Sequence, residues 1–310
     1  MSSNAPIAFF AYKRPEHTLK SLESLSKNQG AEDSELFIYS DGSKCLKDSQ
    51  AVQQVREIIR GKKWCGTVHI IESEVNLGLA SSIISAVTEL CDRYGRVIIL
   101  EDDLILSPYF LDYMNRGLEL YKDSYSITQI SGYMFPVELK TLEAEALFLP
   151  FTASWGWATW QRAWKYLDIE MKGYERLKSN TNLKHKFNLN GSCQKFEMLE
   201  HQIGGKIDSW AIQWYLTTFF QNTLTLYPVK SLVFNMGFDG SGIHCGTSSA
   251  FNTEIYTEKI SAMPKNIKTT FETTNAVFDY LRTLNEPLSL LKRIKRKIKK
   301  LLHQIKYLKP

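Results

Sequence analysis

The sequence has few of the residues that build disulfide frameworks or zinc sites. Its five cysteines are scattered over 310 residues, no two of them form a CxxC pair, and there are only six histidines. Closely spaced Cys and His ligands are needed for a structural zinc site or a disulfide-stapled fold. We therefore expect reduced thiols in a cytoplasmic protein.

Long apolar runs are also missing. No stretch approaches the roughly 18 apolar residues of a transmembrane helix. Residues 1–6 have neither a basic segment nor an apolar core, so we expect no secretory signal peptide. A glycine-rich phosphate loop is absent after the first predicted strand, where the chain reads Tyr-Lys-Arg-Pro.

Acidic residues are absent from the end of the chain. Residues 288–310 hold nine Lys/Arg and no Asp/Glu, which leaves 29 basic against 33 acidic residues before them. The overall charge of +5 thus comes from this tail. A mildly acidic body argues against a nucleic-acid partner.

The tail, residues 287–310, is predicted to form a basic amphipathic helix. Its apolar residues recur at three- and four-residue spacing, with lysine and arginine between them. Such a helix can lie on an anionic membrane surface, at the inner face of the cell membrane. Contact with another protein chain and a solvated tail are the alternatives. The apolar positions are Leu291, Ile294, Ile298, Leu301, Ile305 and Leu308.

The first hundred residues alternate between strand and helix patterns. This order predicts the α/β class, with a mostly parallel, Rossmann-like sheet flanked by helices. In the first helix, Leu19, Leu22 and Leu25 are expected to face the sheet. Strands are expected near residues 7–12, 36–39, 68–71 and 97–100, and helices near 18–25, 52–59 and 80–94.

The pattern changes after residue 108. We expect one domain over residues 1–286, with a nucleotide-binding half at 1–107 and an acceptor-binding half at 108–286. In the second half, helices are predicted at 109–121 and 210–220, strands at 127–130 and, interrupted by Pro228, at 225–234, a loop at 172–192, and weak patterning at 252–286.

Three consecutive carboxylates, Glu101, Asp102 and Asp103, follow the most apolar strand. Like charges this close need a positive neighbour, and a hard divalent cation that also holds phosphates supplies one. A solvated acidic turn is the alternative, but apolar residues flank the carboxylates on both sides. The sequence therefore favours a metal–diphosphate site.

Arg14 and Asp41 follow the first two strands. In a parallel sheet these strand ends share one edge with Asp103, where ligands bind. Arg14 can reach a phosphate or a base, and Asp41 can accept a hydrogen bond from a ribose or uracil. Because Asp-Gly is also a common turn sequence, Asp41 is either a nucleotide-binding residue or a turn residue.

Further candidates lie downstream. Trp155, in a Ser-Trp-Gly turn, can offer its ring to a sugar, whereas Trp157, Trp160 and Trp164 follow helical spacing and predict a core stripe. Asp208 precedes an apolar helix and is either its N-cap or a general base. The glycine-rich residues 237–246, with His244, form either a long turn or a lid over a diphosphate.

The combination of these motifs resembles the GT-A glycosyltransferases, in particular N-acetylglucosaminyltransferase I and similar bacterial sugar transferases. The likeness covers roughly residues 7–247. It rests on Arg14, the Ser-Asp pair at Asp41, an aliphatic strand before Glu-Asp-Asp, and three later segments. These are Ala-Ser-Trp-Gly-Trp at 153–157, Asp-Ser-Trp at 208–210 and Gly-Ile-His at 242–244.

The resemblance implies a role for each candidate. Asp103 would be the protein ligand of Mn²⁺ or Mg²⁺, and Asp102 and Glu101 would contact the ribose and the sugar of the donor. Arg14 and Asp41 would hold the nucleotide.

The resemblance also implies a catalytic base. The family's base lies in a Trp-Asp-Asp-Trp setting. Here the chain reads Ile-Asp-Ser-Trp, so that Ser209 leaves Asp208 as the one carboxylate.

The implied activity is metal-dependent, inverting transfer of a sugar from a nucleotide-diphospho-sugar donor, with a UDP-sugar as first choice. The acceptor would be a hydroxyl of a glycan or of a lipid-linked molecule. A sugar-phosphate nucleotidyltransferase and a non-catalytic glycan-binding protein are the alternatives.

Overall fold

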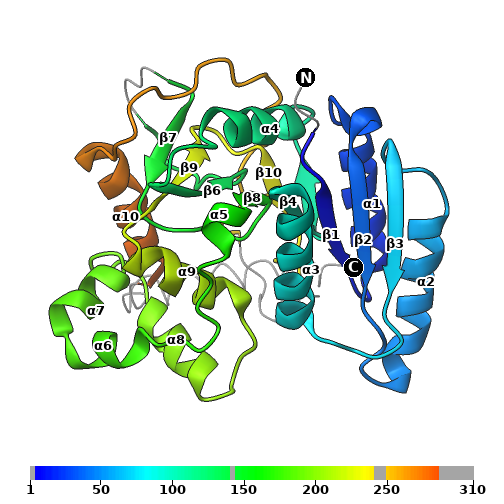
Figure 1. Ribbon diagram of the computed structural model, residues 1–310, viewed down its shortest axis with the longest axis horizontal. Coiled ribbons are helices and arrows are strands. Elements are labelled where there is room, and N and C mark those ends of the chain that lie inside the picture. The colour runs from blue at the N-terminus through cyan, green and yellow to red at the C-terminus, as the bar shows by residue number, and fades with distance from the viewer. Residues whose placement is uncertain (1–3, 140–143, 241–248, 286–310) are drawn as a thin grey trace, which may run out of the picture.

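An eight-stranded sheet runs through the protein in the order β3-β2-β1-β4-β8-β6-β9-β7 (Figure 1). The structure, a computed structural model, describes residues 4–139, 144–240 and 249–285. The sheet strands are β1 (Ile7–Ala11), β2 (Glu35–Ser40), β3 (Thr67–Glu72), β4 (Arg96–Glu101), β6 (Ile127–Ser131), β7 (Ala146–Leu149), β8 (Trp157–Trp160) and β9 (Leu224–Pro228). A second, two-stranded sheet pairs β5 (Leu104–Leu106) with β10 (Val233–Asn235).

Helices cover this sheet on both faces, which confirms the α/β class (Figure 1). The helices are α1 (Pro15–Ser26), α2 (Ser49–Arg60), α3 (Leu79–Tyr94), α4 (Phe110–Leu120), α5 (Gln161–Trp164), α6 (Tyr174–Ser179), α7 (Thr181–Phe187), α8 (Lys195–Ile203), α9 (Trp210–Phe220) and α10 (Phe271–Asn285).

The first four strands of the sheet are parallel. β1 pairs with β2 and with β4, and β2 pairs with β3. β8 runs antiparallel to both β4 and β6, and β7 runs antiparallel to β9. The sheet is therefore parallel where the sequence predicts a nucleotide-binding half, and mixed beyond it.

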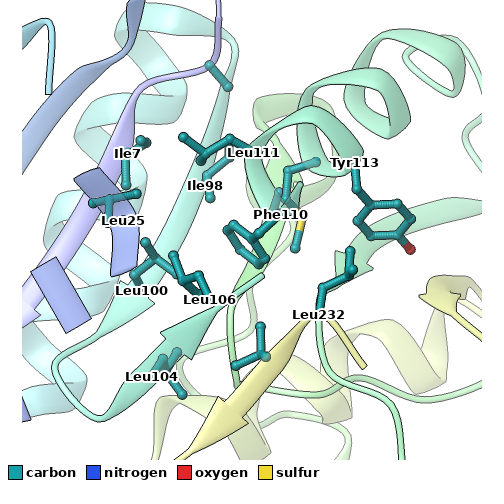
Figure 2. Close-up of a cluster of buried hydrophobic side chains, with 14 of the residues drawn as sticks. Ile7, Leu25, Ile98, Leu100, Leu104, Leu106, Phe110, Leu111, Tyr113 and Leu232 are labelled. Atoms are coloured by element: carbon teal, nitrogen blue, oxygen red, sulfur yellow. The ribbon is translucent and has the colours of Figure 1, made fainter. Parts of the chain in front are cut away.

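The strands alternate their side chains between two cores. Ile7 and Phe9 of β1 pack with α1, α2 and α4, whereas Ala8 and Phe10 pack with α3, α5 and α9. Figure 2 shows the first core, in which Phe110 of α4 lies among the β-strand side chains. These strands are buried on both faces, as expected of a parallel sheet between helices.

A third core fills the end of the sheet opposite α2 (Figure 1). It joins β7 and β9 to helices α6 to α10. Two of these helices, α6 and α7, occupy the segment that the sequence predicts as a loop. Helix α10 lies within residues 252–286, whose pattern is weak. Of its apolar residues, only Val277, Phe278 and Leu281 are buried in the third core.

Other local predictions are wrong in detail. Leu19 is 38% exposed, because Thr18, Ser21, Leu22 and Leu25 form the buried face of α1. Trp157 and Trp160 are core residues, as the stripe predicts, but both lie on strand β8 rather than on a helix. The predicted interruption at Pro228 is confirmed, because β9 ends there; β10 then forms part of the second sheet.

In the three described ranges, no helix has both the length and the apolar character to cross a membrane. The predicted tail helix, residues 287–310, lies outside these ranges.

Candidate active site

The order of the strands brings the predicted residues to one edge of the sheet. β1 lies between β2 and β4. The chain adds β2 and β3 on one side of β1 and then crosses to the other side to add β4. Phe10 is level with Glu101, and Ala11 is level with Ser40. Arg14, Asp41 and the carboxylates of residues 101–103 therefore all follow neighbouring strand ends. Such a switch point is where open α/β sheets bind ligands.

Arg14 joins the first strand end to the carboxylates. Its Nη2 donates hydrogen bonds to Asp102 Oδ1 and, at 3.1 Å, to Asp103 Oδ2. The Arg14 side chain is 20% exposed, and those of Asp102 and Asp103 are 5% and 13% exposed. Burial alone would lower the pKa of Arg14, but the two carboxylates raise it above its ordinary value. This guanidinium is a permanent positive charge at the site.

Asp102 is tied to the protein on several sides. Its Oδ2 accepts hydrogen bonds from the Tyr12 backbone N–H and the Thr18 hydroxyl, both at 3.4 Å. Its carbonyl accepts one from Ser21 Oγ at 2.8 Å. Burial raises the pKa of Asp102, and Arg14 opposes this effect. Asp102 therefore fixes Arg14 and the start of α1 in the resting protein.

Glu101 and Asp103 have carboxylate oxygens that the rest of the described chain leaves available. Among the described residues, no hydrogen bond to the Glu101 carboxyl or to Asp103 Oδ1 occurs. Burial, reinforced by Asp103 and Asp102, raises the pKa of Glu101. Three consecutive carboxyl groups here face one guanidinium, that of Arg14, so acidic side chains outnumber basic ones. A cation would relieve this excess.

A loop after β10 covers Asp103. β10 pairs with β5, which directly follows the carboxylates, and the Met236 N–H donates to the Asp103 carbonyl at 2.8 Å. A Cβ atom at Gly237 would lie 2.3 Å from Asp103 Oδ2, so a larger residue here would require the Asp103 side chain or the loop to shift. Asn235 Oδ1 accepts a hydrogen bond from the Gly237 N–H at 2.6 Å. The loop thus approaches Asp103 as closely as its backbone allows.

His17 holds the far side of this loop. Its Nε2 lies 3.1 Å from Asp239 Oδ2. Neither His17 nor Asn235 is a candidate from the sequence. The available signal for His17 is its position one helical turn after Arg14, which places both side chains at the start of α1.

Asp41 accepts four hydrogen bonds from two neighbouring turns. Oδ1 accepts from the N–H groups of Gly42 and Leu77, and Oδ2 from Asn76 Nδ2 and the Gly78 N–H, at 2.8–3.0 Å. This carboxylate therefore fixes the turn that leads into α3. The structure realises the turn interpretation of Asp41, and its contact with a nucleotide stays a prediction.

Asp208 lies against that same turn. A Cβ atom at Gly78 would be 3.3 Å from Asp208 Oδ2. The side chain is exposed, and Ser209, not Asp208, is the N-cap residue of α9. The cap interpretation of Asp208 is therefore wrong, and its accessible carboxylate stands beside the turn that Asp41 fixes.

Trp155 connects the carboxylate edge with the second half of the chain. Its ring packs edge-on against Tyr133, Phe238 and Phe251 at centroid distances of 4.5, 5.3 and 5.5 Å. Phe238 directly follows Gly237, the residue that touches Asp103. The other face of this aromatic group borders a cavity of about 300 Å³. His244, the second residue predicted for the acceptor or lid, lies outside the described residues.

The site offers few side chains to a metal ion. Within the described ranges, no three His, Cys, Asp or Glu side chains surround a common point. Mg²⁺-like ions keep several waters and bind through one or two carboxylates together with substrate phosphates. Asp103, with one free oxygen, fits such an ion only when a phosphate ligand completes its coordination.

Replacing Arg14 by methionine should destabilise the fold. The substitution would leave Asp102 buried without its positive partner, and we expect the free energy of unfolding to fall by about 3–5 kcal/mol. Lys13→Met is the matched control, because Lys13 pairs with Asp48 at the surface and should change stability little. Urea unfolding measures both, and equal losses would contradict a buried ion pair at Arg14.

Comparison with known proteins gives remote likenesses only. No protein-family model matches the chain, and no curated protein does. Among solved structures, a cytidylyltransferase from Leptospira borgpetersenii serovar Hardjo-bovis (strain JB197) has 14% identity and a TM-score of 0.33, over 53% of this chain and 63% of that one. UDP-glucose pyrophosphorylase complexed with UDP-glucose has 11% identity and a TM-score of 0.38, over 75% of this chain and 93% of that one. S. aureus TarS has 13% identity and a TM-score of 0.38, over 74% of this chain and 36% of that one.

The chain thus spans less than two thirds of the cytidylyltransferase and of TarS. Likenesses of this extent do not fix an activity, which has to come from the side chains described above.

Proposed function

We propose that the protein is a metal-dependent, inverting glycosyltransferase of the GT-A type. It would transfer a sugar from a nucleotide-diphospho-sugar, with a UDP-sugar as first choice, to a hydroxyl of a glycan or lipid-linked acceptor. The observation that carries the proposal is the cluster of Arg14 with Glu101, Asp102 and Asp103 at the switch point of the sheet. The cluster has one fixed cation and an excess of carboxylates, which suits a diphosphate accompanied by a metal ion.

The donor would bind along the ends of β1, β2 and β4, within residues 1–107. Asp103 would hold Mn²⁺ or Mg²⁺, and the bound ion neutralises the charge of a leaving diphosphate. Arg14 lies beside Asp103 and would contact the nucleotide phosphates. Glu101 would accept hydrogen bonds from the donor's hydroxyls. Asp102 and Asp41 would act largely by fixing Arg14 and the 76–78 turn around the nucleotide.

The acceptor would bind in residues 108–286, with Asp208 as general base. Its exposed carboxylate would take the proton of the acceptor hydroxyl while that oxygen attacks the anomeric carbon. The bond from this carbon to the diphosphate oxygen breaks on the opposite face, and the configuration inverts. Trp155 would present its ring to the acceptor, and His244 would contact the acceptor or belong to a lid.

Two other functions remain as alternatives. A sugar-phosphate nucleotidyltransferase would need backbone N–H groups after β1 to cradle phosphates, whereas the Tyr12 N–H already faces Asp102. A non-catalytic glycan-binding protein would not hydrolyse a nucleotide-sugar. Slow, metal-dependent release of UDP from UDP-sugars would support the transferase and count against both alternatives.

The basic tail would keep the enzyme at the inner face of the cell membrane. Each Lys or Arg close to an anionic surface contributes about 1 kcal/mol, and the apolar stripe can enter the headgroup region. This attachment would bring the active site to acceptors that are held in the membrane.

Asp103→Asn should abolish metal-dependent donor binding without unfolding the protein, because the amide loses the charge that a divalent cation needs. A thermal-shift panel of UDP-, GDP-, CMP- and dTDP-sugars, with and without Mn²⁺, measures the effect. The wild type should gain stability with one nucleotide only when Mn²⁺ is present. Asp92→Asn, an exposed carboxylate on α3, is the control. If the Asp103→Asn variant keeps the Mn²⁺-dependent thermal shift, Asp103 is not a ligand of the metal ion.

Asp208→Asn should lower kcat by roughly 10²–10⁴-fold, the usual contribution of a general base, and leave donor affinity nearly unchanged. Ser209→Ala is the neighbouring control, because Ser209 begins α9 without a side-chain capping bond. Steady-state kinetics with the donor identified by the panel measure both variants. If the Asp208→Asn variant has the same kcat as the Ser209→Ala control, another group is the base.

Truncation at Pro287 should abolish binding to vesicles. The full chain should sediment with vesicles of anionic phospholipid and be released by salt, because screening weakens its lysine and arginine contacts. The truncated chain should stay in the supernatant. Equal behaviour of the two chains, or binding that ignores lipid charge, would rule out attachment through the tail.

A further inference from the structure

The cavity beside Trp155 has walls from six separate segments. They are the chain after β6, the chain between β7 and β8, the chain from residue 189 to the start of α8, the start of α9, the chain at residue 251, and the end of α10. Its volume of about 300 Å³ is at the lower end of the range for small-molecule sites. The residues that line it are Tyr133, Phe135, Phe151, Thr152, Ala153, Ser154, Trp155, Leu189, Cys193, Lys195, Trp210, Ala211, Trp214, Phe251, Leu281, Leu284 and Asn285.

The chemistry of this lining is unusual for a sugar pocket. Aromatic and aliphatic side chains form most of the wall. Among the lining residues that the structure describes, Lys195 is the only ionisable side chain apart from a cysteine and a tyrosine. None of the lining residues in the described part of the chain is a carboxylate, although carboxylates are the common partners of sugar hydroxyls. Hydroxyl groups placed here would lose water without gaining enough hydrogen bonds. A hydrocarbon group with one anionic end matches the lining better.

The walls are held in place by their own contacts. Trp214 Nε1 donates a hydrogen bond to Gln129 Oε1 at 2.7 Å. The Trp210 ring stacks on Trp157 at a centroid distance of 4.8 Å and an interplanar angle of 16°. Because these tryptophans belong to the buried core, the cavity is already formed in the free protein.

The cavity also adjoins the proposed reaction site on two sides. Trp210 lines it, and Asp208 lies two residues earlier. Trp155 lines it as well and packs on Phe238, whose neighbour Gly237 touches Asp103. The cavity therefore shares one wall with the segment that follows the proposed base and another with Trp155, which contacts the loop over the proposed metal ligand.

We propose that this cavity binds the hydrocarbon part of an amphiphilic acceptor, and that Lys195 binds the phosphate joined to it. That the ligand is an acceptor rests on the proposed function. Binding of an alkyl phosphate in the cavity does not depend on it. The reacting hydroxyl would then lie outside the cavity, on the side of Asp208.

Quenching of tryptophan fluorescence can measure this binding directly, since three tryptophans line the cavity. The probes are decyl phosphate, decanoate, decanol and inorganic phosphate, each added to the full chain below the concentration at which micelles form. We expect saturable quenching by decyl phosphate, with affinity about tenfold above that of decanol. Decanoate of equal or higher affinity would reassign the anionic group from phosphate to carboxylate and overturn that part of the proposal. Inorganic phosphate should cause no quenching.

Two variants locate the binding. Ala211→Phe on α9 should fill the cavity and lower the affinity for decyl phosphate at least tenfold. Ala51 on α2 is also half-buried, and Ala51→Phe should leave this affinity unchanged. Lys195→Gln should lower the affinity for decyl phosphate about tenfold and leave that for decanol unchanged. Lys178→Gln, at an exposed position of α6, is the charge-matched control. Near-UV circular dichroism checks that each variant is folded.

The outcomes separate this inference from the proposed function. Unchanged binding in both Ala211→Phe and Lys195→Gln, or no binding of decyl phosphate at all, overturns the cavity assignment even if UDP-sugars bind with Mn²⁺. Cavity-dependent binding of decyl phosphate without any nucleotide-sugar binding supports the cavity and contradicts the glycosyltransferase.

Discussion

The ion pair between Arg14 and the consecutive carboxylates Asp102 and Asp103 constrains the rest of the site. Buried carboxylates are costly without a positive partner, and removing that partner is costlier still. The pair also fixes geometry. Asp102 binds Arg14, the Tyr12 N–H and Thr18, so the first turn of α1 and the end of β4 cannot move independently. The edge at which a ligand would bind is thus rigid before any ligand arrives.

The same edge extends into the second half of the chain through backbone contacts. β5 follows the carboxylates directly and pairs with β10, which brings Gly237 onto Asp103 and Phe238 onto Trp155. A residue larger than glycine at 237 would force the Asp103 side chain or the loop to move. Gly237 and Phe238 therefore link the polar edge at Asp103 to Trp155, one of the residues that line the apolar cavity.

Much of this arrangement could be predicted from the sequence, because strand order and apolar periodicity are local signals. The strand ends at Arg14, Asp41 and Glu101 follow from the alternation of strands with helices. What could not be predicted depends on contacts between distant segments. The pairing of His17 with Asp239 needs the loop after β10, and the strand assignment of Trp157 needs the antiparallel insertion of β8 beside β4. The cavity needs the third core, whose helices α6, α7 and α10 have weak patterns.

Three hydrogen bonds to Asp41 hold the turn at residues 76–78, against which the proposed base lies. Gly78 has φ +80°, a conformation that glycine adopts readily, and its open side faces Asp208. A side chain at this position would crowd the Asp208 carboxylate at 3.3 Å. Asp41 therefore need not touch a nucleotide to matter for catalysis. By fixing the turn against which Asp208 packs, it would set where the base stands relative to the donor edge.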